Sequence, residues 1–215
     1  MFDVSAAVRA CAPVYYFDHR EIESPVNLQK FVMTKAEVPD NTVSAVFTPS
    51  ADGDGGFIHY FLFFMRDAGM SVFGVNLGSH RYDIEQTIVQ VNGQGKIVGL
   101  QFMPHNVKEH FWIKDTYDLA MIVRDGHPQV YVSLGKHGCY PVAGTVTRYL
   151  GFLSDVCDNP VRQTLEAVIL SDAMVKLKYI GAGFQGIRSR LTVNKSVPTI
   201  RLSDVRLHNV LPVFR

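Results

Sequence analysis

Short runs of hydrophobic and β-branched residues recur along the chain, some alternating with polar residues, and turn-forming residues separate them. Runs of this length and spacing are typical of β-strands in an all-β fold. The predicted strands are Val14 to Phe17, Thr42 to Phe47, Phe57 to Phe64, Ser71 to Val75, Ile84 to Val91, Lys96 to Met103, Leu119 to Val123 and Gln129 to Leu134. The pattern therefore predicts an all-β protein, a β-sandwich with few short helices.

Two polar segments between these runs are predicted to be turns. Asn92-Gly93-Gln94-Gly95 is a hairpin signal, and it predicts antiparallel pairing of Ile84 to Val91 with Lys96 to Met103. Ser50 to Gly56 has the alternating aspartates of a calcium loop. It lacks the closing glutamate and the flanking helices of an EF-hand, so we interpret it as a flexible turn.

Helix signals are few. Ser24 as N-cap and Pro25 in the first turn predict a helix that continues to Phe31. A second helix is predicted from Asn159 to Glu166, although Ala167 to Leu170 would serve equally well as a strand. No repeat or linker divides the chain, so we predict one domain over residues 1–215.

Composition excludes several functional classes. The chain has 215 residues, 47% of them hydrophobic, which is enough for one core. Its 21 basic and 20 acidic residues give a net charge of +1 without a dense basic cluster, which argues against a nucleic-acid partner. The longest apolar run, Phe57 to Met65, is far shorter than the roughly 20 residues of a transmembrane helix.

The N-terminal region and the cysteines predict an intracellular location. Met1 to Ala12 lacks a basic segment followed by an apolar core, so it is not a secretory signal. The three cysteines, Cys11, Cys139 and Cys157, are an odd number without C-x-x-C spacing. Buried free thiols in a reducing compartment are therefore expected.

An imidazole and two carboxylates gather in the segment Ser79-His80-Arg81-Tyr82-Asp83-Ile84-Glu85. Asp83 and Glu85 are two positions apart on a predicted strand, so they project from the same face. Gly78 and Ser79 would allow a turn that brings His80 toward them. These ligand types suit Mg²⁺, Ca²⁺, Mn²⁺ or Zn²⁺. A solvated strand edge is the alternative, since the spacing also arises by chance.

Other residues could support this site or contact a ligand. His137 lies between Gly135 and Gly138, which permit close backbone approach, although a turn histidine bonded to its own backbone fits equally well. The remaining candidates for this supporting role are Tyr82, His105, His110 and Asp155.

Signatures of nucleophilic hydrolases and nucleotide-binding enzymes are absent: the sequence has no G-x-S-x-G, Walker loop, H-E-x-x-H or dinucleotide fingerprint. Cys139 follows His137 by two residues, but so close a pair seldom points side chains at one another, and a buried structural thiol is favoured. No catalytic residue is therefore assigned.

Asp67 followed by the segment from Ser79 to Glu85 resembles the necrosis- and ethylene-inducing cytolysins, whose hallmark is G-H-R-H-D-W-E with an aspartate upstream. This resemblance implies a divalent cation, and Ca²⁺ or Mg²⁺ is expected before Mn²⁺ or Zn²⁺. The implied metal ligands are Asp67, His80, Asp83 and Glu85. The chain departs from the hallmark at Ser79, Tyr82 and Ile84, which bear on shape and activity more than on cation binding.

Residues 12–158 resemble the related vacuolar protein sorting-associated family sixty-two. The resemblance rests on the order of Ala12 to Tyr15, His59 to Phe64, the His80-x-x-Asp83-x-Glu85 spacing, and Gly135 to Pro141. It implies a compact β-sandwich with a cation at one end, where loops converge. Residues 159–215 are expected to complete or extend the sandwich.

Three functions remain open from the sequence. The first is a non-enzymatic cation-dependent module that binds a glycan or a lipid headgroup. The second is a structural protein, such as a minor component of a virus particle, that forms a homo-oligomer or larger assembly through its apolar tail, Val210 to Phe214. The third is a metal-dependent hydrolase with His137 as acid or base.

Overall fold

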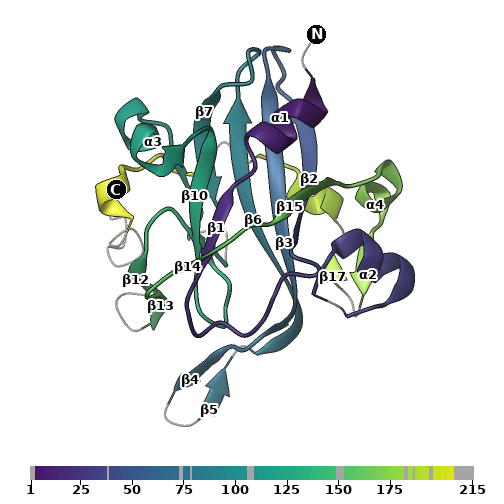
Figure 1. The fold of residues 1–215 in the computed structure, drawn as a ribbon, viewed down its shortest axis with the longest axis vertical. Coiled ribbons are helices and arrows are strands. Elements are labelled where there is room, and N and C mark those ends of the chain that lie inside the picture. Colours follow the sequence, from purple (N-terminus) through teal and green to yellow (C-terminus); the bar gives the residue numbers. More distant parts are fainter. Residues whose placement is uncertain are drawn as a thin grey trace.

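A six-stranded sheet forms one layer of the computed structural model (Figure 1). The structure describes residues 3–37, 39–72, 75–77, 79–105, 109–148, 153–181, 184–185, 187–193 and 196–205. In spatial order, the strands of this sheet are β15 (Glu166–Ile169), β2 (Thr42–Pro49), β3 (Gly56–Asp67), β6 (His80–Val91), β7 (Ile97–Phe102) and β8 (Phe111–Ile113).

A smaller sheet packs against the first. Its strands are β11 (Cys139–Tyr140), β10 (His127–Val132), β1 (Val14–Phe17) and β14 (Val161–Gln163), and β9 (Val123–Arg124) pairs with β10. One hydrophobic cluster contains Tyr15 and Val130 from this sheet together with Tyr60 and Leu100 from the larger one. The two sheets therefore enclose a common core, which confirms the predicted β-sandwich.

Three two-stranded sheets complete the described strands: β4 (Met70–Val72) with β5 (Val75–Leu77), β12 (Gly144–Arg148) with β13 (Leu153–Cys157), and β16 (Tyr179–Gly181) with β17 (Phe184–Gln185). The β4–β5 pair extends beyond the sandwich, at the end where β3 finishes and β6 begins (Figure 1). It therefore marks the end that carries the candidate metal ligands.

Strand β3 is buried on both faces, which explains its almost unbroken hydrophobic sequence. Leu62 and Phe64 point into the core between the sheets. Phe61 and Phe63 point to the other side, where they pack with residues of α2 (Leu28–Thr34) and α4 (Asp172–Lys176). Because successive side chains of a strand face opposite ways, a strand covered on both sides has no polar face.

The predicted hairpin is present. Asn92 donates its backbone N–H to the Lys96 carbonyl, and Gly95 donates to the Asn92 carbonyl. These bonds connect β6 to β7, which pair antiparallel. Ser50 to Gly55 forms the turn between β2 and β3, and Ser50 donates its backbone N–H to the Gly55 carbonyl across it. All three cysteines are buried and free, as expected.

The predicted strand from Leu119 to Val123 is wrong, because α3 (Thr116–Ile122) occupies this segment. The Asp115 side chain accepts the N–H groups of Tyr117 and Asp118, which caps the helix. Its buried positions include Leu119 and Ile122, a helical spacing that the β-branched end of the segment concealed.

Other element boundaries also differ from the predictions. The first predicted helix begins at Leu28 with Asn27 as its cap, because Val26 instead donates its N–H to the Phe63 carbonyl. The predicted helix from Asn159 to Glu166 is absent, since β14 and β15 occupy that part of the chain. In place of the strand from Ser71 to Val75, the described residues there belong to two strands, β4 and β5.

Four further helical elements of the described residues had no prediction: α1 (Val4–Ala10), α4, η3 (Ile187–Arg190) and η4 (Leu202–Asp204). Among the described residues, no helix has the length and apolar character needed to cross a membrane. The apolar tail from Val210 to Phe214, which was expected to dock on a neighbouring subunit, lies outside the described residues.

Candidate metal centre

The candidate metal ligands meet where β3 ends and β6 begins. Asp67 stands directly opposite His80 in the antiparallel register of these strands. One ligand atom from each of Asp67, His80 and Asp83 lies within 4.8 Å of the other two. Two carboxylates and an imidazole at this separation could hold a divalent cation.

The backbone of Tyr82 explains how His80 and Asp83 share one face. In a regular strand, residues three positions apart point to opposite faces. Tyr82 has a φ of 63°, which is left-handed and rare for a side chain of this size. This residue interrupts the alternation, so His80 joins the face of Asp83.

Aromatic packing secures the Tyr82 ring on the other side of the sheet. Its centroid lies 6.2 Å from that of Phe63, with nearly parallel planes, and 5.4 Å from that of Phe31. The Arg81 guanidinium lies 5.3 Å from the Tyr82 centroid. Tyr82 was predicted as a ligand-binding or supporting residue; its ring packs on Phe63 and Phe31, and its role at the site stays a prediction.

His80 is oriented for ligation. Its Nδ1 lies 3.2 Å from the Tyr82 carbonyl oxygen, which can only accept a hydrogen bond. This contact favours the proton on Nδ1 and leaves Nε2 facing the Asp67 carboxylate, 3.6 Å from Oδ2. A ligating histidine commonly has its second nitrogen bonded to a backbone carbonyl in this way. The His80 side chain is 49% exposed, so the site opens to solvent.

His137 approaches the group of Asp67, His80 and Asp83, here called the metal group, from the side of the smaller sheet. Its Nδ1 is 3.1 Å from Oδ2 of Asp83, and the ring stacks on Phe64 with 3.6 Å between centroids. Its Nε2 lies 3.7 Å from Glu21 Oε2. The ring therefore contacts Asp83 and not the backbone of its own turn, and it is fully buried.

Glu21 was not predicted as a site residue, although it organises the loop that carries His137. Its Oε2 accepts the N–H of Gly135, and its Oε1 accepts the N–H groups of Ile22 and Glu23. The residue follows β1 in the chain, and only the parallel pairing of β1 with β10 brings it to this loop. No local sequence signal could have indicated that contact.

Glu85 lies deeper on the inward face of β6. It is 4% exposed, and its Oε2 has no hydrogen-bond partner among the described residues. Burial and the nearby Asp83 raise the pKa of Glu85 well above its usual value, while Arg190 opposes this shift. The described group of mutually close ligand atoms contains Asp67, His80 and Asp83 without Glu85, so its role as the fourth ligand stays a prediction.

A second polar cluster surrounds Asp155. Its Oδ2 accepts from Tyr140 and contacts His105 Nε2, both at 2.6 Å, and its Oδ1 lies 3.2 Å from Lys136 Nζ. Gly138 packs so tightly here that a Cβ would lie 2.6 Å from His105 Nε2. The predicted supporting residues His105 and Asp155 thus contact each other, in a cluster of their own.

His110 is buried near this cluster and is not part of the metal group of described residues. Burial is the main cause that lowers the pKa of His110 to about 4, and the charges of Arg190 and His105 add to it. A neutral imidazole suits a buried position that has cationic neighbours.

The donor set fits a divalent cation. Asp67, Asp83 and Glu85 are all buried at this end of the sheet. Buried carboxylates are costly unless they are paired or coordinate a metal. His137 partners Asp83, whereas one oxygen of Glu85 has no hydrogen-bond partner among the described residues. A cation among these groups would compensate the excess of negative charge.

Comparison with known proteins gives distant structural similarities. No family model matches the sequence. No curated protein matches it either. The resemblance to the vacuolar protein sorting-associated family therefore stays a prediction.

Three solved structures illustrate the structural similarity. Necrosis and Ethylene inducing Protein 2 from the causal agent of cocoa's Witches Broom disease has a TM-score of 0.41 and 17% identity, covering 61% of this chain and 63% of its own. A toxin fold for microbial attack and plant defense has a TM-score of 0.47 and 14% identity, over 77% and 74% of the two chains. NLPPya in complex with mannosamine has a TM-score of 0.48 and 12% identity, over 96% and 90%. The structural neighbours of this chain thus include necrosis and ethylene inducing proteins.

Proposed function

We propose that the protein is a non-enzymatic, divalent-cation-binding β-sandwich module that uses its cation to bind a glycan or a lipid headgroup. The observation that carries this proposal is the convergence of Asp67, His80 and Asp83, whose ligand atoms lie within 4.8 Å of one another. Glu85 is proposed as the fourth ligand, acting directly or through a water molecule.

The choice of ion follows from the donor types. Carboxylate oxygens suit Ca²⁺ and Mg²⁺, which we propose as the first candidates. The imidazole of His80 also suits Mn²⁺ and Zn²⁺, so these ions are the alternatives. No thiol belongs to the group of described ligand residues, which argues against a softer ion.

The exposed side of the site supports binding of a polar ligand. The His80 side chain is 49% exposed, whereas that of Asp67 is 10% exposed. A cation bound here would have protein ligands on its inner side and open coordination positions toward solvent. Sugar hydroxyls and phosphate oxygens are suitable ligands for such positions.

Thermal unfolding of chelator-treated protein tests cation binding. A ligand at a hundredfold excess over its Kd stabilises the folded state by about 2.7 kcal/mol. For a domain of this size, that corresponds to a rise in Tm of roughly 5–10 °C. We expect this rise with at least one of Ca²⁺, Mg²⁺, Mn²⁺ and Zn²⁺, and its loss in Asp83→Asn.

Asp52→Asn is the matched control, because Asp52 is an exposed aspartate in the turn between β2 and β3. It should keep the full cation response. If no ion raises Tm, or if Asp83→Asn responds like the native protein, the protein is not a cation-binding module at this site.

Calorimetric titration then tests the polar ligand. Glucosamine, mannosamine and phosphocholine are added to protein saturated with the stabilising ion, and again after addition of EDTA. We expect heat of binding only in the presence of the ion. A cation response without any binding of these probes would leave cation binding intact and reject the glycan or headgroup function.

A metal-dependent hydrolase is the second candidate, favoured by one observation. His137 Nδ1 lies 3.1 Å from Asp83 Oδ2, within hydrogen-bond reach of the metal group. The ring is fully buried, however, and its two nitrogens face Asp83 and Glu21. Hydrolysis of p-nitrophenyl acetate or phosphate that requires an ion and is abolished by His137→Gln would establish this function.

A further inference from the structure

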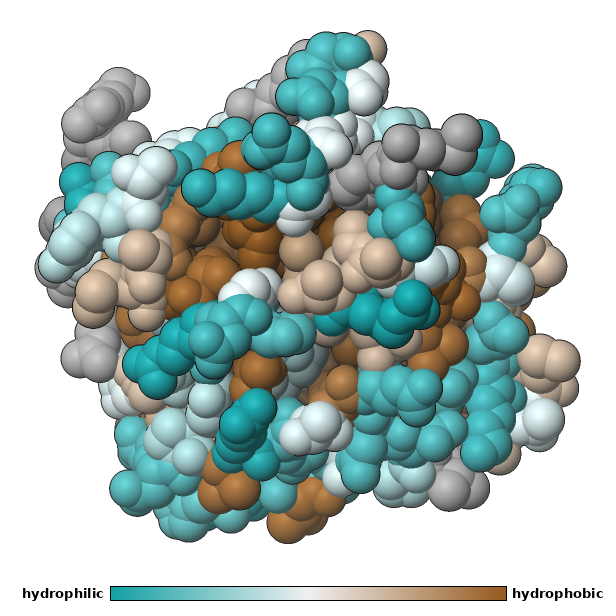
Figure 2. Space-filling view, turned by 45° about the horizontal axis from the view of Figure 1, so that its top comes forward, coloured by the Kyte–Doolittle hydropathy of each residue, from teal (hydrophilic) through white to brown (hydrophobic). Residues whose placement is uncertain are grey.

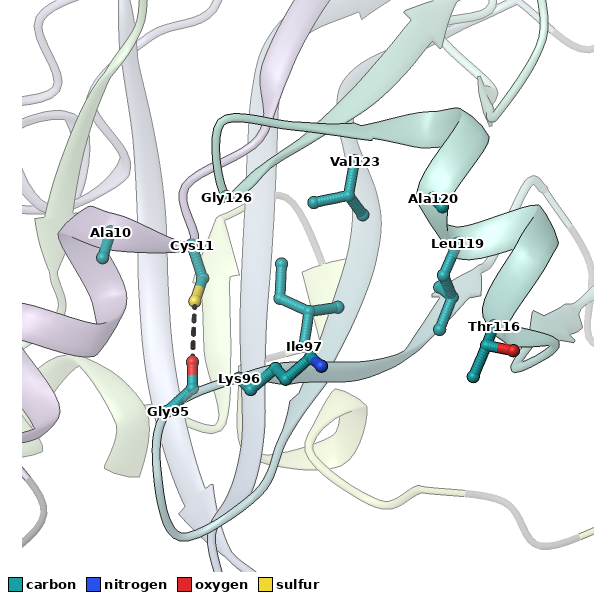
Figure 3. A pocket seen from close by; sticks show the side chains of 10 residues that line it. All are labelled: Ala10, Cys11, Gly95, Lys96, Ile97, Thr116, Leu119, Ala120, Val123 and Gly126. Atoms are coloured by element: carbon teal, nitrogen blue, oxygen red, sulfur yellow. Dashed lines mark hydrogen bonds between the residues drawn. The ribbon is translucent and has the colours of Figure 1, made fainter.

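A cavity of about 450 Å³ opens between α1, the turn before β7, and α3 (Figure 3). Its volume is within the range of about 300 to 1,000 Å³ that is typical of ligand pockets. The turn that lines it follows Val91, the last residue of β6, whereas the candidate metal centre includes His80, the first. The cavity and the metal centre therefore lie at opposite ends of one strand.

Aliphatic side chains form most of the wall. Ile97 projects into the cavity from β7. Leu119 of α3 and Val123, the residue directly after α3, project toward the same space (Figure 3). The space remains open because the other contributing positions are small, including Ala10, Ala120, Gly95 and Gly126. Figure 2, which brings this end of the molecule forward, shows a hollow whose floor is hydrophobic.

The polar groups of the cavity are few. The Cys11 thiol is already engaged, since it donates to the Gly95 carbonyl oxygen at 3.6 Å. Burial raises the pKa of Cys11, so the thiol stays protonated and adds no charge. An apolar chain that occupies the cavity would therefore leave the thiol with its hydrogen-bond partner.

Lys96 is the one charged residue among the ten that line the cavity. It is exposed, and no carboxylate of the described residues lies within 4.0 Å of its ammonium nitrogen. Asp115 directly precedes the lining residue Thr116. Its carboxylate lies 3.4 Å from the Arg201 guanidinium, which compensates its negative charge. Lys96 thus provides an unpaired positive charge beside an apolar space.

We propose that this cavity binds a free, single-chain aliphatic carboxylate of medium length, such as a fatty acid. The hydrocarbon chain lies among Ile97, Leu119 and Val123, where it is removed from water. The carboxylate forms a charge-assisted hydrogen bond with Lys96 at the rim. This site is separate from the proposed cation function and does not depend on it.

Calorimetric titration with sodium decanoate tests the proposal. We expect saturable binding to the native protein. Ala120→Phe, which places a ring at the mouth of the cavity, should weaken it by about tenfold or more. Met121→Phe is the matched control, because Met121 is the next residue on α3, is 55% exposed and does not line the cavity.

Lys96→Gln tests the polar contact. It should weaken decanoate binding by roughly tenfold, since a charge-assisted bond is lost. Lys178→Gln removes an exposed lysine that does not line the cavity, so it is the charge-matched control. Decanol should bind weakly, and equally to the native protein and Lys96→Gln. Equal affinity of the native protein for decanol and decanoate would overturn the proposed contact with Lys96.

Methyl NMR of the native protein provides a test that needs no variant. Decanoate should shift the methyl signals of Ile97, Leu119 and Val123. Those of Leu62 and Ile84, which are buried in other parts of the larger sheet, should stay in place. Absence of shifts in the cavity residues, or decanoate binding that Ala120→Phe leaves unchanged, would reject the site.

Discussion

Asp83 and His137 are 54 positions apart in the sequence, and Oδ2 of the first lies 3.1 Å from Nδ1 of the second. Asp83 belongs to β6 of the larger sheet, whereas His137 follows β10 of the smaller one. Phe64, which pairs with Asp83 across the strands, stacks on the same imidazole. The position of the Asp83 carboxylate therefore depends on the assembly of both sheets.

The first prediction concerns His137→Ala in the metal-free protein. The substitution leaves a cavity beside Phe64 and removes the hydrogen-bond donor to Asp83. We expect a loss of about 2–4 kcal/mol in the free energy of unfolding, measured with urea. His137→Gln retains a donor and most of the volume, so it should lose less. Losses that are equal for the two variants would contradict a role for this hydrogen bond.

The second prediction concerns the left-handed backbone at Tyr82. A β-branched residue is strongly disfavoured at a φ of 63°, so Tyr82→Val should restore regular alternation and turn His80 away from Asp83. We expect the cation-dependent rise in Tm to shrink or vanish, although no ligand has been removed.

Tyr82→Gly is the companion variant, because glycine adopts positive φ freely. It loses the ring contacts with Phe63 and Phe31, so its Tm without cation should fall. Its rise in Tm with cation should persist. If Tyr82→Val retains the full cation response, the backbone of this residue does not set the geometry of the site.

The third prediction concerns acid destabilisation through His59. Burial lowers the pKa of His59 from 6.5 to about 4. Between these pH values the unfolded chain binds the proton and the folded protein does not, so stability falls as pH falls from 6.5 to 4. The shift corresponds to a loss on the order of 3 kcal/mol. His110, whose pKa is also lowered to about 4, should add to it.

Urea unfolding at pH 7, 5.5 and 4.5 measures this effect. His59→Gln can keep hydrogen bonds to Thr48 and Gln86, which the native ring makes at 2.9 Å each. It should lose less stability on acidification than the native protein does. An identical pH dependence of the two proteins would show that His59 titrates alike in the folded and unfolded states.

The fourth prediction concerns thiol reactivity. Burial raises the pKa values of Cys11, Cys139 and Cys157, and the thiolate is the reactive form. Native protein should therefore react slowly with a thiol reagent such as DTNB, and all three thiols should react in urea. Fast reaction of one thiol in the native protein would show that its environment is more open than the structure indicates.

Strands β2, β3, β6 and β7 of the larger sheet were predictable because their signals are local, whereas β8 was not predicted. The long hydrophobic run identifies β3. The turn from Asn92 to Gly95 identifies β6 before it and β7 after it. Helix α3 was not predicted, because the β-branched residues at its end indicated a strand and Asp115 was not recognised as its N-cap. The sequence indicated the ligand types of the site, while the left-handed Tyr82 and the contact of Glu21 with Gly135 arise from tertiary structure.

The topology of the site also affects how it forms during folding. Asp67, His80 and Asp83 all lie on the β3–β6 pair, whose strands are joined through the short β4–β5 segment. His137 and Glu21 come together only after β1 pairs with β10, which joins Val14 to Gln129. Local pairings form faster than distant ones, because closing a long loop costs more entropy. We therefore expect the ligand group to assemble early in folding and its buried histidine support to be added in a later, slower step.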